Sequence, residues 1–223
     1  MENENKLKKQ AKSVEAITPP SFEELPDLGL YMDQVTGYLN RHLKALAPEL
    51  EDTPLTPSMI NNYVKNGHIG RPVQKKYSRE QLAALYMLCS LKSNLSIPDA
   101  AALVRFLSEE RGADGAYNDF VGEQKKVMAE VVATFASLPE EPQDKDLTAL
   151  AHGLIQRACA ERLAAEAVLA YLTEKNEARL AAERAQEEEE RRAREEAERI
   201  KKAAERAEKA EKAKKTAAEK KKG

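Results

Sequence analysis

Apolar residues recur at helical spacing along most of this chain, and polar segments with proline or glycine interrupt them. Within Leu30–Leu46 one apolar residue appears in almost every turn, which predicts an amphipathic helix with a single apolar face. The residues of this face are Val35, Leu39, Leu43 and Leu46. The following connector, Ala47–Pro54, is acidic and contains two prolines, as is typical of a loop. Because clusters of β-branched residues are few, the pattern predicts a mostly helical protein.

A short helix is predicted over Pro57–Asn66. Thr56 is a good N-cap, because its hydroxyl can accept a hydrogen bond from the free amides of the first turn. Pro57 then falls at the first helical position, where the missing N–H costs nothing. Gly67 can adopt the left-handed conformation of the residue that follows a helix. Local signals therefore mark both ends of this helix.

Two further helix starts follow. Ser78 with Gln81 three residues later forms a capping box, and Ser96 with Asp99 gives a looser N-cap. Between the helix that ends before Gly67 and the helix that begins after Ser78 lies a short basic connector. A helix, a basic connector and a second helix in this order are typical of a winged helix-turn-helix that reads DNA.

The segment Leu55–Ser93 carries a net positive charge, although the whole chain is slightly acidic. It contains only one acidic residue, Glu80, whereas the whole chain has a net charge of −2 and a pI near 6.1. Its basic residues are Lys65, Arg71, Lys75, Lys76, Arg79 and Lys92. Such a patch suits neutralisation of DNA phosphates, which supplies most non-specific affinity and makes it salt-dependent.

The helix Pro57–Asn66 also carries asparagines, which can pair with the N6/N7 edge of adenine in the major groove. The residues predicted to face the bases are Ser58, Asn61 and Asn62. The residues predicted to contact phosphates or hold the wing are Tyr63, Lys65, Arg71, Lys75, Lys76 and Arg79. The alternative is a helical bundle with lysines in a solvated loop.

The same segment resembles the recognition helix and wing of mercury-resistance-type (MerR-like) regulators. The matching positions are Thr56–Ile60, Tyr63, Gly67, Ile69, Tyr77, Ser78 and Leu82. In that family a second helix pair follows, which Leu95–Val104 resembles, and then a long helix that dimerises. Where the family usually has an arginine and an aromatic residue in the recognition helix, this chain has Asn61 and Asn62. No cysteine cluster follows, so metal sensing is not predicted.

A second resemblance covers more of the chain. Glu24–Val35, together with Leu55–Gly67 and residues 75–82, resembles an uncharacterised bacterial family, domain of unknown function 1836. This resemblance runs from about Ser21 to Val104. The family has no established activity, so it implies a regulator only by analogy.

Two more helices are predicted beyond Val104. A break at Arg111–Gly115 precedes a helix near Tyr117–Ser137, and a break at Pro139–Pro142 precedes a helix that begins near Asp146. Each helix has an apolar stripe, formed by Val127, Met128, Val131, Val132 and Phe135 in the first and by Leu147, Leu150, Ala151, Leu154, Ala158, Leu163, Val168 and Leu172 in the second. The stripes are either core that faces the DNA-reading module or a dimer surface.

The tail from about Lys175 onward consists mostly of alanine and charged residues. Apart from the alanines, its only aliphatic residues are Leu180 and Ile200, so no coiled-coil seam is predicted. Glutamates precede basic residues by four positions in the favourable order, which predicts a long, solvated, isolated helix that continues the preceding one and frays toward Lys220–Gly223. The pairs are Glu187–Arg191, Glu188–Arg192, Glu190–Arg194, Glu195–Arg199, Glu198–Lys202, Glu205–Lys209, Glu208–Lys212 and Glu211–Lys215. The tail is either a spacer whose lysine-rich end touches nucleic acid or an acidic partner, or a solubilising extension.

These patterns predict four parts: a flexible N-terminus (1–20), a helix-turn-helix module (21–110), a helical continuation (111–175) and a charged tail (176–223). The predicted fold class is mostly all-α, with a MerR-like winged helix-turn-helix followed by a long charged C-terminal helix.

Other functional classes find little support in the sequence. The histidines His42, His68 and His152 have no metal-ligand or catalytic-triad spacing, and Cys89 and Cys159 are single and far apart. No apolar run approaches the ~18 residues of a membrane span, and the N-terminus has no signal-peptide core, so a cytoplasmic protein is expected.

We therefore predict a sequence-specific DNA-binding transcriptional regulator that binds double-stranded DNA as a homodimer. It is not expected to be an enzyme or to need a cofactor or metal. The alternative is a helical adaptor that uses the fold for protein contacts and the charged helix as a spacer.

Overall fold

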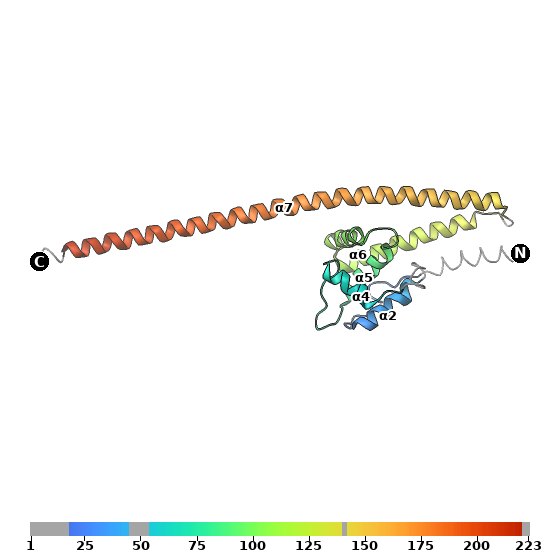
Figure 1. Ribbon diagram of the computed structural model, residues 1–223, viewed down its shortest axis with the longest axis horizontal. Helices are drawn as coiled ribbons and strands as arrows, with labels where there is room; N and C mark the ends of the chain where they lie inside the picture. Colours follow the sequence, from blue (N-terminus) through green and yellow to red (C-terminus); the bar gives the residue numbers. More distant parts are fainter. Residues whose placement is uncertain (1–17, 45–53, 140–141, 220–223) are drawn as a thin grey trace. The chain divides into compact units, whose positions relative to one another are not determined.

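The computed structural model describes residues 18–44, 54–139 and 142–219, and within the last range it describes side chains up to residue 202. Its helices are α2 (Met32–Leu43), α4 (Pro57–Lys65), α5 (Arg79–Leu91), α6 (Ile97–Ala136) and α7 (Asp144–Glu219) (Figure 1). The predicted all-α class is confirmed, and within these ranges β-structure is limited to isolated bridges. The chain divides into two units between Leu169 and Ala170.

Helix α5 forms the centre of the first unit. Its residues from Leu82 to Cys89 are buried, apart from the partly buried Ala84, and α2 and α6 pack against it. Cys89 is fully buried, and burial raises the pKa of its thiol to about 12, so this residue acts as a small hydrophobic residue of the core. Because α5 is apolar nearly all round, it needs cover on several sides, and α2 and α6 provide much of it.

The apolar face predicted for the first helix is confirmed, since Val35, Leu39 and Leu43 are fully buried. The helix itself is shorter than Leu30–Leu46 at its start. The backbone N–H and C=O of Leu30 are paired with those of Tyr77, at 3.0 and 2.8 Å, and a residue paired in this way cannot join the helix. Leu46 and most of the predicted connector lie outside the described residues.

The helix caps read from the sequence are confirmed. The hydroxyl of Thr56 accepts from the Met59 N–H, and Ser78 and Gln81 form the reciprocal bonds of a capping box. Ser96 caps α6 in the same manner. Gly67 follows α4 with φ of 75°, the left-handed conformation expected there.

The break predicted at Arg111–Gly115 is a kink at one residue. Gly112 has φ 73° and ψ 171° inside α6, and the two parts of this helix run in different directions (Figure 1). The part beyond the kink returns to the core, where Tyr117 is fully buried and Val121 is nearly so. The backbone N–H of Phe22 also donates to Asn118 Oδ1 at 2.9 Å. The folded core therefore extends past residue 110, where the sequence analysis placed the module boundary.

The apolar stripes predicted for the last two helices are only partly buried. In α6, Val131 and Phe135 are half-buried, and in α7 Leu154 is half-buried. Further along α7, Leu163 and Val168 are 60% and 59% exposed, whereas Leu169, which the sequence analysis did not single out, is buried. The buried side of α7 thus contains Leu169, and apolar surface is left exposed beside it.

The second unit is the continuation of α7 from Ala170, and its described side chains lie largely exposed. The predicted continuous helix is confirmed. Of the predicted pairs, Glu188–Arg192, Glu190–Arg194 and Glu198–Lys202 form, at 2.6, 3.7 and 2.5 Å. Arg191 pairs instead with Glu195. The pairs beyond residue 202, and the expected fraying at the end, fall outside the described side chains and residues.

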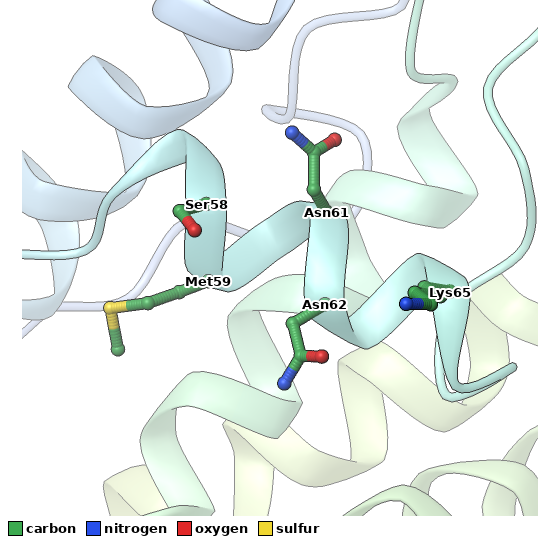
Figure 2. Close-up of a pocket in the computed structure, with 5 residues that line it drawn as sticks. All are labelled: Ser58, Met59, Asn61, Asn62 and Lys65. Atoms are coloured by element: carbon green, nitrogen blue, oxygen red, sulfur yellow. The ribbon is translucent and has the colours of Figure 1, made fainter.

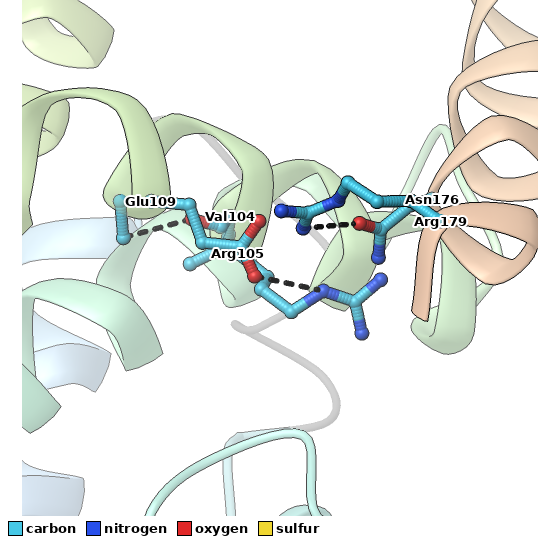
Figure 3. Close-up of polar contacts among 6 residues, drawn as sticks. Val104, Arg105, Glu109, Asn176 and Arg179 are labelled. Atoms are coloured by element: carbon cyan, nitrogen blue, oxygen red, sulfur yellow. Dashed lines mark hydrogen bonds and ion pairs between the residues drawn. The ribbon is translucent and has the colours of Figure 1, made fainter. Parts of the chain in front are cut away.

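Ion pairs and hydrogen bonds between side chains of neighbouring turns occur in both units, and Figure 3 shows an example from each. In α6 the Arg105 guanidinium lies 3.8 Å from the Glu109 carboxylate, and in α7 Arg179 donates to the Asn176 side chain at 2.8 Å. Such exposed pairs each contribute little to the free energy of unfolding.

No described helix combines the length and the apolar character that a membrane span requires.

Candidate nucleic-acid interface

The exposed face of α4 is polar and free of acidic groups. Its members follow one another at helical spacing and are all exposed: Ser58, Asn61, Asn62, Lys65 and Asn66. They share the helix with Ile60 and Tyr63, which are buried on the opposite side. Four of them, with Met59, line a shallow hollow on the surface (Figure 2). This face offers hydroxyl, amide and ammonium groups to a polar, anionic partner.

Tyr63 does not belong to this face. Its side chain is only 5% exposed, and burial raises the pKa of the phenol to about 12. The reason is its spacing, since Tyr63 lies three positions after the buried Ile60 and so shares the core side of α4. The predicted contact of Tyr63 with phosphate or wing is therefore corrected to a packing role in the core.

An asparagine that the sequence analysis did not single out holds the start of α4. The Asn40 side chain, on α2, donates from Nδ2 to the Leu55 carbonyl oxygen at 3.0 Å, and its Oδ1 accepts from the Leu55 N–H at 2.8 Å. Leu55 is buried and directly precedes the N-cap Thr56. The clamp thus fixes where the chain enters α4. Its only sequence signal is a polar residue beside the apolar face of α2.

The basic connector contains a tight hairpin. Val73 and Lys76 exchange backbone hydrogen bonds of 3.1 and 2.9 Å, and the two residues between them, Gln74 and Lys75, have φ of 51° and 66°. Positive φ at both central residues is the signature of a type I′ turn, whose twist suits a hairpin. The ends of the connector are fixed by the buried Ile69 and Tyr77. We call Val73–Lys76 the basic hairpin.

The basic residues in and beside this hairpin differ in how closely other side chains contact them. Arg71 and Lys75 are exposed, as is Lys76, whose Nζ lies 5.3 Å from the centre of the Tyr31 ring. Arg79 is the most engaged of the predicted phosphate contacts. Its guanidinium lies 3.6 Å from the Asp27 carboxylate and 5.6 Å from the centre of the Phe22 ring, and its side chain is 25% exposed. Its main role is therefore to hold the segment before α2 against α5.

The basic hairpin provides a direct test of its backbone geometry. A side chain at positive φ is strained, so Lys75→Gly is expected to raise the free energy of unfolding by about 0.5–1 kcal/mol. Lys76→Gly is the matched control, because Lys76 has ordinary φ, and it is expected to be neutral or destabilising. Urea denaturation of both variants measures the difference. A loss of stability in Lys75→Gly equal to that in Lys76→Gly contradicts the strained turn.

No group of three or more His, Cys, Asp or Glu side chains suited to hold a metal ion is found in the described parts of the chain. Residues 20–120 match the model of a family described as Domain of unknown function (DUF1836). The resemblance expected for Ser21–Val104 is therefore confirmed, and it continues past the kink in α6. No curated protein and no solved structure matches the chain.

Proposed function

We propose that this chain, with its DUF1836 match over residues 20–120, is a sequence-specific DNA-binding transcriptional regulator that docks α4 in the major groove. The observation that carries the proposal is the exposed face of α4, which offers hydroxyl and amide groups with one lysine and no acid. The major groove admits an α-helix, and its base edges present hydrogen-bond donors and acceptors that such groups can match. The order of helix, helix, basic hairpin and helix is also similar to that of MerR-like regulators, which makes the winged helix-turn-helix part of the proposal.

In this proposal the side chains divide into two roles. Ser58, Asn61 and Asn62 face the bases, and the exposed cations neutralise phosphates. These cations are Lys65, Arg71, Lys75 and Lys76. With about 0.9 counterions released per neutralised phosphate, they account for a salt slope of about −3 to −4 for each copy.

A homodimer is part of the same proposal, because one short recognition helix gives little affinity and two-fold sites double the contacts. The exposed Leu163 and Val168 of α7 support it by offering apolar surface of the kind that protein interfaces use. The protein is proposed to act in the cytoplasm, without catalysis or cofactor.

The experiment that tests the proposal is selection of random duplex DNA on the full chain, followed by salt titration of the best site. We expect an enriched motif with two-fold symmetry. Lys75→Ala/Lys76→Ala is expected to reduce the slope of log K against log salt by about 2 per copy and to weaken all sequences alike.

The matched control is Lys125→Ala/Lys126→Ala. It removes the same charge from two adjacent lysines of α6, outside the proposed interface, and is expected to leave the slope nearly unchanged. Equal effects of the two double variants contradict the assignment of the interface to the basic hairpin, because general loss of positive charge then accounts for both.

A helical adaptor is the second candidate function, and the same exposed apolar surface of α7 favours it. In this case α7 is the spacer and a protein is the partner. Absence of any enriched duplex, together with loss of a protein interaction on deletion of residues 176–223, supports the adaptor over the regulator.

A further inference from the structure

Two asparagines on the exposed face of α4 are bonded to each other. Asn66 Nδ2 donates to Asn62 Oδ1 at 3.2 Å, and both residues are exposed. The backbone N–H of Asn66 also donates to the Asn62 carbonyl oxygen at 3.0 Å, because Asn66 is the C-cap of α4. Asn66 is thus tied to Asn62 through both backbone and side chain.

The bond orients the Asn62 amide. Its oxygen is turned toward the Lys65 end of the helix, and its nitrogen points away from that end (Figure 2). An amide oxygen has two lone pairs, so Oδ1 can accept from Asn66 and still accept from a base. Nδ2 remains available as a donor beside it. Asn62 therefore presents a donor and an acceptor side by side, in an orientation that the bond to Asn66 favours.

Among the base edges of the major groove, adenine matches this pair. It offers the N7 acceptor and the N6 donor next to each other, whereas guanine offers two acceptors and would place O6 against the amide oxygen. The only cation on this face is Lys65, a point charge without the planar fork with which arginine binds guanine at two atoms.

We infer that Asn62 reads an adenine in the major groove and that Asn66 is the residue that positions the Asn62 amide for it. This inference rests on the proposed function and names the base that the site selects. Ordering the amide before binding saves the conformational entropy that an exposed side chain otherwise loses in the complex. Asn66 therefore acts on specificity through Asn62, without a base contact of its own.

The test uses the full chain, its selected duplex and the three other base pairs at the position that depends on Asn62. Asn62→Ala is expected to lose the preference for adenine, about 5- to 100-fold. Asn66→Ala is expected to lose part of it at the same position. The double variant Asn62→Ala/Asn66→Ala is expected to discriminate no worse than Asn62→Ala alone, because a positioning residue has no effect once its target is gone.

Two controls separate positioning from a general weakening. Lys65→Ala is expected to weaken all four duplexes alike and to leave the preferred base unchanged. Asn66→Gly removes the same side chain but changes the end of the helix differently, so it should reproduce the loss seen in Asn66→Ala. Thermal unfolding of each variant shows whether the fold is retained.

Several outcomes overturn the inference. Additive losses in the double variant show that Asn66 contacts DNA independently, and a guanine or no preference at the position dependent on Asn62 rejects the adenine assignment. In both cases the enriched duplex still supports the regulator. Absence of any enriched duplex overturns the proposed function and the inference together.

Discussion

Tyr117→Ala is expected to lower the free energy of unfolding by about 3–5 kcal/mol, whereas Tyr117→Phe is expected to leave it unchanged or raise it. Tyr117 is fully buried beyond the kink of α6. Its ring centre lies 6.2 Å from that of Phe22 and 5.6 Å from that of Tyr86, in edge-to-face arrangements. Removal of the ring leaves a cavity where three segments of the chain meet.

The hydroxyl has the opposite effect on stability. Tyr117 Oη is buried and has no hydrogen-bond partner among the described residues. A buried polar group without a partner costs about 1–3 kcal/mol, and a phenylalanine of the same shape removes that cost. Burial also raises the pKa of Tyr117, so the phenol is neutral in the core.

Urea denaturation followed by circular dichroism measures both variants. Phe120→Ala is the control, because Phe120 lies one turn further along α6 and is only partly buried against the core, so a smaller loss is expected. If Tyr117→Phe destabilises by more than about 1 kcal/mol, the hydroxyl has a partner that contributes to the fold.

The importance of Tyr117 was not visible in the sequence, and the reason is physical. A cap hydroxyl bonds an amide within three residues, so Thr56, Ser78 and Ser96 could be read from their immediate neighbours. The contact between Phe22 and Tyr117 joins residues that are far apart in the sequence, and no local pattern encodes it. Glycine at a kink and glycine in a loop have the same local signature, which is why the core seemed to end near residue 110.

In the candidate site too, some features follow from the local sequence and others do not. The exposed spacing of Ser58, Asn61 and Lys65 follows from helical periodicity once the buried side of α4 is known. An aromatic residue with a polar tip fits either side of a helix, so Tyr63 was assigned to the wrong one. Similarly, the side-chain bond between Asn66 and Asn62 depends on rotamers that the sequence does not specify.

Asn40→Ala is expected to have the second large effect, a loss of about 2–4 kcal/mol in the free energy of unfolding, because two backbone groups lose their partners at once. Without the Asn40 amide, the N–H and C=O of Leu55 are left unpaired in a partly buried site. The next residue, Thr56, is the N-cap of α4, so the loss falls where the chain enters the helix.

Asn61→Ala is the matched control, since Asn61 is an exposed asparagine on α4 itself. Its effect on stability is expected to stay within about 0.5 kcal/mol, as for most surface substitutions, while affinity for the selected duplex falls. Urea denaturation and duplex binding of both variants, measured below the unfolding transition of each, separate the two roles.

Binding by folded Asn40→Ala tells whether the clamp also sets the position of α4. Base contacts require placement of the helix to within fractions of an ångström, and a looser entry at Leu55 is expected to weaken binding of every sequence beyond what the unfolded fraction explains. Full stability in Asn40→Ala contradicts the clamp, because burial of Ile60 and Tyr63 then suffices to hold α4. Reduced stability with full affinity in the folded fraction assigns Asn40 to the fold alone. The expected result, in which both stability and affinity fall, makes an α2 side chain outside the proposed interface a determinant of how α4 is positioned.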